Sequence, residues 1–154
     1  MMKSGMQIQM ATAHDFERIA ELFDLYRQFY LQISDLEASK SFIRERLTNN
    51  ESVIFCAVTA DLAVGFVQLY PSFSSVSMKK LWILNDLFVH PDSRKKGVAS
   101  KLLEAATQFA IETKAKALTL KTAQDNLPAQ ALYSSLGWKL NTRFQTYDLA
   151  IEQI

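Results

Sequence analysis

The sequence predicts an α/β fold in which one mixed sheet of six or seven strands carries helices on both faces. Two patterns predict this class. Strand and helix patterns alternate along the chain, and a near-continuous apolar run over residues 81–89 is followed by an amphipathic helix. The chain of 154 residues holds only three Pro and four Gly, so few residues of the kind that mark loops and linkers are present to indicate a domain boundary. We therefore expect a single domain over residues 1–154.

The first third of the chain predicts one strand and two helices. The strand is expected near residues 7–11, and Thr12 follows it as a helix N-cap with Asp15 three positions on. A helix over residues 14–30 then carries a broad apolar surface. A second helix is expected over about 36–47.

Two strands joined by a tight hairpin come next. They are expected at residues 52–59 and 64–70, with the turn at 60–63, and residues 71–80 read as an exposed loop. The lone cysteine, Cys56, falls in the first of these strands, where a small buried thiol is expected rather than a nucleophile.

The apolar run over residues 81–89 predicts a strand buried on both faces, and Pro91 ends it. Apolar residues recur at helical spacing beyond Gly97, so the next helix begins within a basic loop. The expected order closes with a strand near 117–121, a short helix over 129–135, and two strands near 138–140 and 145–151.

The junction between that strand and helix has the features of a phosphate site. A helix start presents unpaired backbone N–H groups and the positive end of the helix dipole, and Arg94, Lys95 and Lys96 add full charges there. A pyrophosphate would be bound well at this point. The alternative is an ordinary solvated basic turn.

Three segments together resemble the GNAT superfamily of N-acetyltransferases. The spacing Arg94-x-x-Gly97-x-Ala99 resembles its acyl-CoA-binding signature. Residues 84–89 resemble the strand that lies along the pantetheine arm, and residues 126–138 resemble the family's Asn…Ala…Leu-Tyr…Leu-Gly-Phe segment. The pattern is closest to that of diamine N-acetyltransferases.

The resemblance implies the GNAT fold, with a splayed central strand pair and acetyl-CoA bound in the gap between residues 84–89 and 117–121. Backbone groups of the first strand would hold the pantetheine amides and polarise the thioester carbonyl. The residues that the resemblance assigns to the cofactor are Leu87, Phe88, Val89, Arg94, Lys95, Lys96, Gly97, Val98, Ala99, Ser100, Asn126 and Tyr133.

Tyr133 matches the family's tyrosine that protonates or stabilises the departing thiolate, so the resemblance implies a general acid there. A core tyrosine on a short helix is the alternative. Asn126 matches a position that either contacts the cofactor or caps the following helix, and both roles stay open.

The general base is where the sequence departs from the diamine pattern, because Asn85 stands where those enzymes carry a glutamate. A protonated amine must lose a proton before it attacks, and an amide cannot accept that proton. Asp86, a water chain anchored by Asn85, or a residue elsewhere could take it. Asp86 is a carboxylate inside an apolar run, where a charge requires a binding partner or a function. A role as the base or in binding is one interpretation, and a structural cap of a bulge is the alternative.

The acceptor is expected to be a primary amine of a small molecule. The resemblance places its pocket beside the first two helices, where Tyr26, Tyr30, Tyr70 and Phe73 would join Asn85 and Asp86. Aromatic residues at helical spacing also occur as ordinary core. A non-catalytic acyl-CoA-binding module of the same fold is the rival function, since the family's glutamate is missing.

Composition excludes several other classes. A formal net charge of +1 offers no general attraction for nucleic acid or an anionic membrane, and no apolar run approaches the roughly 20 residues of a membrane span. Neither His14 nor His90 has companions at metal-ligand spacing, so no metal is expected. A cytoplasmic location is the default expectation, and a homodimer through the closing strands is left open.

Overall fold

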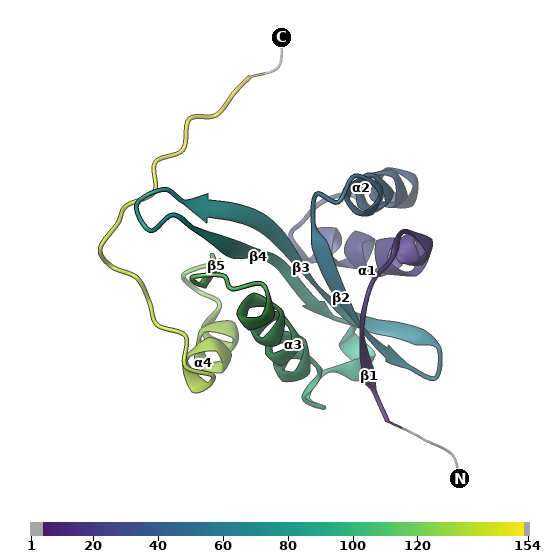
Figure 1. Cartoon of the computed structure of the whole chain (residues 1–154). Coiled ribbons are helices and arrows are strands. Elements are labelled where there is room, and N and C mark those ends of the chain that lie inside the picture. Colours follow the sequence, from purple (N-terminus) through teal and green to yellow (C-terminus); the bar gives the residue numbers. More distant parts are fainter. Residues whose placement is uncertain (1–4, 153–154) are drawn as a thin grey trace. The chain divides into compact units, whose positions relative to one another are not determined.

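Within residues 5–152, five strands form one mixed sheet in the order β1-β2-β3-β4-β5 (Figure 1). The first four pair antiparallel, and β5 runs parallel to β4. The computed structural model describes residues 5–152, which form two units that meet between Lys121 and Thr122, and the sheet lies in the first unit. Its strands are β1 (Gln7–Met10), β2 (Val53–Thr59), β3 (Leu62–Ser74), β4 (Lys79–Val89) and β5 (Leu118–Leu120).

Helices cover both faces of this sheet, as predicted (Figure 1). A 3-10 turn (Ala13–Asp15) leads into α1 (Phe16–Phe29), and α2 (Leu36–Thr48) packs against α1 on the same side. The opposite face carries α3 (Val98–Glu112). The predicted N-cap is confirmed, because Thr12 and Asp15 form a reciprocal capping box in which the Thr12 N–H donates to Asp15 Oδ2 at 2.7 Å.

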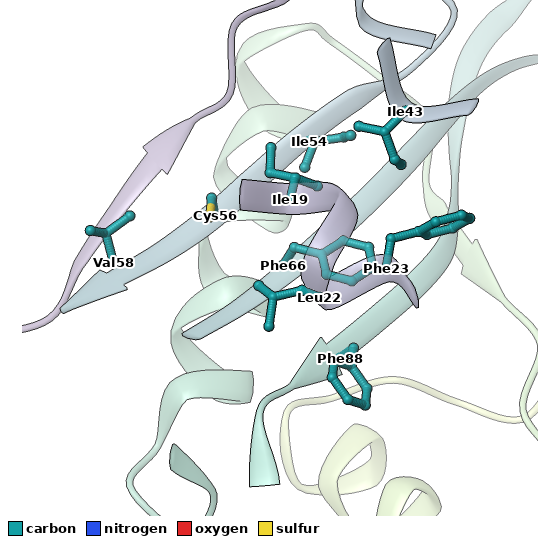
Figure 2. Close-up of a cluster of buried hydrophobic side chains, with 9 residues drawn as sticks. All are labelled: Ile19, Leu22, Phe23, Ile43, Ile54, Cys56, Val58, Phe66 and Phe88. Carbon is teal, nitrogen blue, oxygen red and sulfur yellow. The ribbon is translucent and has the colours of Figure 1, made fainter. Parts of the chain in front are cut away.

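The core between the sheet and the first two helices is built from large apolar side chains (Figure 2). Its members are Ile19, Leu22, Phe23, Ile43, Ile54, Cys56, Val58, Phe66 and Phe88. Cys56 is 1% exposed, and burial raises the pKa of its thiol to about 11. A thiol in this state is not a nucleophile at neutral pH, so the sequence interpretation of Cys56 as a core residue is confirmed.

The predicted exposed loop over residues 71–80 is wrong, because β3 continues to Ser74 and β4 begins at Lys79. Pro71 is compatible with this strand for a simple reason. It lies opposite Trp82, whose N–H donates to Ala117 O at 3.1 Å on the β5 side, so the Pro71 nitrogen faces away from β4. The pairing with β2 has already ended at Leu69, and the missing N–H therefore breaks no hydrogen bond.

A bulge interrupts β4 in the middle of the sheet. Gln68 pairs with Asp86, but the next residue, Leu69, pairs with Leu84, so Asn85 is the extra residue. The bulge reverses the side-chain alternation. Asp86 consequently faces α1 together with Gln68.

The second unit contains α4 (Leu127–Ser135) and an extended C-terminal segment. The closing strands predicted near 138–140 and 145–151 do not form in the described residues, which lowers the strand count from six or seven to five. An alternating pattern makes a strand only where a neighbouring strand accepts its hydrogen bonds, and neither segment is paired. Within residues 5–152, no helix combines the length and apolar character that a bilayer span requires.

Candidate active site

The edge of β4 that faces β5 is open over its last residues. The parallel pairing joins only Trp82, Ile83 and Leu84 to β5 in the described part of the chain. On the other edge, the His90 N–H donates to Val64 O at 2.8 Å, on the β3 side. Backbone groups alternate along a strand, so the N–H groups of Leu87 and Val89 point to the open edge. The family resemblance implies a gap between the two strands at this place, and the short pairing agrees with it.

The junction after β4 is shaped like an anion cradle. Gly97 is the N-cap residue of α3, with φ of 79°, and no side chain in the described part of the chain caps this helix end. A Cβ placed on Gly97 would meet no heavy atom within 4 Å. The space in front of the helix start is therefore clear, and its first N–H groups can receive a phosphate.

Two cations of this loop are fixed by backbone carbonyls. Arg94 donates through Nε to Val89 O at 3.0 Å, and its guanidinium lies 5.5 Å from the centre of the Phe88 ring. Lys96 Nζ donates to Asp92 O at 3.4 Å. Arg94 thus ties the loop to the end of β4, close to the open edge. Both side chains belong to the loop that leads into α3.

Asp86 is the central carboxylate of the same region. It is 4% exposed and accepts a hydrogen bond from Gln68 Nε2 at 2.6 Å and one from Asn85 Nδ2 at 3.1 Å. Tyr26 reaches this group from α1, and its hydroxyl donates to Asn85 O at 3.4 Å. The bulge at Asn85 is what brings these side chains together.

Burial raises the pKa of the Asp86 carboxyl, and the hydrogen bonds from Gln68, Tyr26 and Asn85 offset part of that rise. Burial, and then the Asp86 charge, raise the pKa of the Tyr26 phenol well above its usual value. Tyr26 therefore stays protonated and can only donate toward the carboxylate. Asp86 is ionised less readily than an ordinary aspartate and is a stronger base once ionised.

Most of the aromatic residues expected in the acceptor pocket do lie near Asp86. The Tyr30 ring packs edge-on against Tyr26, with 5.1 Å between centres. Burial and the Asp86 charge raise the pKa of Tyr70 to about 12. Phe73 lies apart from this group. It is 73% exposed and pairs with Lys80 near the far end of the hairpin.

The two expected site residues of the second unit lie on or beside α4. Asn126 is its N-cap and accepts a hydrogen bond from the Ala129 N–H at 3.2 Å, so the capping role is present. The Tyr133 ring lies 5.9 Å from that of Trp138.

Two features of this region are absent from the sequence prediction. The first is Gln68, although a glutamine in the apolar strand next to that of Asp86 is a detectable signal. The second feature is an open surface depression of about 560 Å³. No pattern within one segment reveals it, because its walls come from α2, the following turn and β3. Its lining residues are Phe42, Arg46, Glu51, Tyr70 and Pro71.

Comparison with known proteins places these features in a family. Residues 17–138 match the model of the acetyltransferase (GNAT) family. A Bacillus subtilis protein described as uncharacterized N-acetyltransferase YhfO is 47% identical, with 95% of this chain and 98% of that protein aligned. A probable acetyltransferase from Haemophilus influenzae is 31% identical over 95% of this chain and 99% of its own length. The crystal structure of a probable acetyltransferase superposes with a TM-score of 0.91 at 42% identity, covering 96% of this chain and 99% of the other.

Proposed function

Because the chain belongs to the acetyltransferase (GNAT) family, we propose that it moves an acetyl group from acetyl-CoA directly to the primary amine of a small molecule. The observation that carries this proposal is the position of Asp86. A buried carboxylate with a raised pKa stands at a bulge, one residue before the open edge of the strand that would hold the thioester. No covalent enzyme intermediate is required, since the nucleophile is the nitrogen of the acceptor.

The residues around α3 fit the cofactor. Gly97 leaves clear space at an uncapped helix start, and Lys95 and Lys96 add charge for the pyrophosphate. The Leu87 and Val89 N–H groups on the open edge would hold the pantetheine arm in the manner of a neighbouring strand. Acetyl-CoA supplies an activated acetyl thioester at this place. One of the two N–H groups would donate to the carbonyl oxygen as negative charge develops there, a contribution often worth about 3 kcal/mol.

Asp86 is the proposed general base. An acceptor arrives as an ammonium ion, and its nitrogen becomes nucleophilic only after a proton passes to a carboxylate oxygen. Gln68 and Asn85 donate to both oxygens of Asp86 and fix its plane, while Tyr26 remains a protonated donor beside it. Each of these groups positions the base without competing for the proton.

Tyr133 is the proposed general acid. A phenol can deliver its proton to the departing thiolate of CoA, and the family resemblance assigns this role to the tyrosine of the segment over residues 126–138. Asn126 supports the proposal indirectly, because its cap fixes the start of the helix that carries Tyr133.

A homodimer is part of the same proposal. Five large apolar side chains of the C-terminal segment are strongly exposed, and a second copy of the chain would remove them from water. They are Leu140, Phe144, Tyr147, Leu149 and Ile151. Light scattering on the full chain should give twice the mass of one chain. A monomeric mass would contradict the dimer.

Release of CoA thiol in the presence of acetyl-CoA and a panel of amines, amino acids and peptides tests the function. We expect turnover with at least one class of primary amine and a product that carries one acetyl group by mass spectrometry. Tight binding of acetyl-CoA by calorimetry with no product from the whole panel would instead identify a non-catalytic acyl-CoA-binding module.

A further inference from the structure

The second unit has no buried core of its own. Every residue from 122 to 152 is at least partly exposed, and α4 contributes no buried side chain. Among the described residues, the buried apolar side chains all belong to the first unit. Holding one residue in a single backbone conformation costs about 1–2 kcal/mol, so a segment without a core needs another surface to keep its structure.

Residues 138–152, the C-terminal arm, have the sequence pattern of a strand. Tyr147, Leu149 and Ile151 alternate with one acidic and one small residue, so the three large apolar side chains share one face of an extended chain. They are 87%, 86% and 81% exposed. Within the described chain, no backbone group of residues 139–152 is hydrogen-bonded to another backbone group. The edge of a sheet would pair these groups and cover the apolar face together.

β5 has a free edge of the kind that such a strand requires. It lies at the end of the sheet and, among the described residues, pairs with β4 alone. Its apolar side chains are also incompletely covered. Leu118 and Leu120 are only partly buried, whereas their register partners in β4, Trp82 and Leu84, are 5% and 4% exposed. The edge therefore lacks both hydrogen-bond partners and apolar contacts on one side.

We propose that the C-terminal arm of one chain adds as a strand to the free edge of β5 in a second copy, while the arm of that copy adds to the first. The described chain leaves its own arm and its own β5 edge unpaired, and this exchange pairs both. A two-fold axis closes the arrangement, so neither arm remains free to recruit a third copy. The apolar face of each arm would lie against Leu118 and Leu120. The inference deepens the proposed homodimer by naming its interface.

The exchange would also position Tyr133, the proposed general acid. α4 carries this residue and lies in the chain between β5 and the arm. The Trp138 N–H donates to Tyr133 O at 3.0 Å, and the two rings are 5.9 Å apart, so the start of the arm is fixed to the end of the helix. An arm held by a second copy therefore restrains this helix. The step rests on the function proposed for Tyr133, whereas the phosphate site at Gly97 lies in the first unit and does not depend on it.

Leu149→Asp tests the interface, because it places a charge on the apolar face of the arm. The substitution occurs twice in a symmetric dimer, so dimerisation should weaken by roughly a hundredfold or more. Analytical ultracentrifugation over a range of concentrations measures this change. Leu62→Asp is the matched control. Leu62 is a leucine of the first unit that is 68% exposed at the start of β3, and its substitution should leave the mass and the turnover unchanged.

Turnover of monomeric Leu149→Asp should fall roughly ten- to a thousandfold, as for the loss of a positioned acid, while its affinity for CoA by calorimetry stays close to that of the wild type. Tyr133→Phe added to Leu149→Asp should lower turnover little further, because the acid is already out of place. A purely structural role of the arm would instead let the two losses add. Thermal unfolding shows whether each variant folds.

Engineered disulfides show which chain supplies the added strand, without disturbing the apolar face. Thr119 lies between the two leucines of β5 and points to the opposite face, as Asp148 and Ala150 do in the arm. Thr119→Cys combined with Asp148→Cys or Ala150→Cys should therefore give a disulfide between two chains, seen as twice the chain mass on a non-reducing gel. Thr119→Cys with Leu149→Cys should not, because these side chains would lie on opposite faces. Cys56 is buried and should stay reduced.

The outcomes separate this inference from the proposed function. The expected masses and disulfides without acetylation of any amine would support the exchange and reject the function. Acetylation by a wild type that is monomeric at every concentration would support the function and overturn the exchange. A dimeric Leu149→Asp, or a disulfide from Thr119→Cys with Ala150→Cys inside one chain, would also overturn the exchange. Full turnover of monomeric Leu149→Asp would overturn the positioning of Tyr133.

Discussion

Gln68 and Asp86 are register partners in the sheet, and the Gln68 amide donates to the Asp86 carboxylate at 2.6 Å in a position where Gln68 is fully buried. Gln68 Oε1 has no hydrogen-bond partner among the described residues. A protonated Asp86 could donate to an amide oxygen after a rotation of the Gln68 side chain, whereas the ionised form requires the Nε2 donor. The pair can therefore accommodate both protonation states of the carboxyl group.

Asp86→Asn should lower turnover by roughly 10²- to 10⁴-fold, because the variant has no group that accepts the ammonium proton. In the wild type, kcat/KM should rise with pH through the raised pKa of Asp86. In the variant, kcat/KM should no longer rise through that pKa. Its pH dependence should instead follow the pKa of the acceptor amine. Rate profiles from pH 5 to 10 measure both effects.

Asp61→Asn, in an exposed hairpin turn, is the control and should keep the wild-type profile. A variant at position 86 with the wild-type profile would show that the base lies elsewhere.

The same substitution at two buried aspartates should change stability in opposite directions. Burial raises the pKa of Asp86, so the fold favours its neutral form, and the stabilisation of that form is lost as the pH rises through the folded pKa. At Asp24, burial also raises the pKa of the carboxyl group. Hydrogen bonds from Ser34, the Asp35 N–H and Ser39 outweigh this effect, so the pKa is lowered. The stabilisation from Asp24 is therefore present above the unfolded pKa, about 3.9, and is lost as the pH falls through the lower folded pKa.

At pH 8, Asp86→Asn should raise Tm, and Asp24→Asn should lower it by roughly 3–8 °C. Both differences should shrink in acid, where the wild-type carboxyl groups become protonated. Thermal unfolding by circular dichroism at pH 3, 5 and 8 measures them. A fall in Tm for Asp86→Asn at pH 8 would show that the ionised carboxylate stabilises the fold.

Tyr133→Phe should lower turnover by roughly ten- to a thousandfold while the affinity for acetyl-CoA stays close to that of the wild type. A phenol beside the departing sulfur contributes only as charge develops, so its loss affects the transition state more than binding. Steady-state rates and calorimetry separate the two quantities. Tyr147→Phe, which removes an exposed phenol, is the control. Full turnover in the variant at position 133 would leave Tyr133 with a packing role against Trp138.

Gly97→Val should weaken CoA binding at least tenfold, because the added side chain would occupy the clear space where a phosphate must approach the helix start. The variant also carries backbone strain, since φ is 79°. Gly137→Val matches that strain, with φ of 91° and equally clear space, and should lose comparable stability without a comparable loss of affinity. Calorimetry with CoA compares the two. Similar affinities for CoA in both variants would show that the phosphate does not bind beside Gly97.

The sequence by itself determined the elements that depend on local patterns. Residues 81–89 form a strand, as their near-continuous apolar run predicts. Thr12 and Asp15 form the predicted capping box, and Gly97 is the N-cap residue of α3. The chain's membership of the acetyltransferase (GNAT) family was likewise predicted from motifs within single segments.

Only the tertiary structure decided which side chains meet. The extra residue at Asn85 appears only when β4 is aligned with β3, and it turns Asp86 toward Gln68 and Tyr26, which lie 18 and 60 positions earlier in the sequence. Pro71 continues a strand because the neighbouring strand has already ended, and Arg46 and Tyr70 line one open depression because α2 packs beside β3. Periodicity describes one segment at a time. Pairing register and packing depend on segments far apart in the chain, so local patterns cannot specify them.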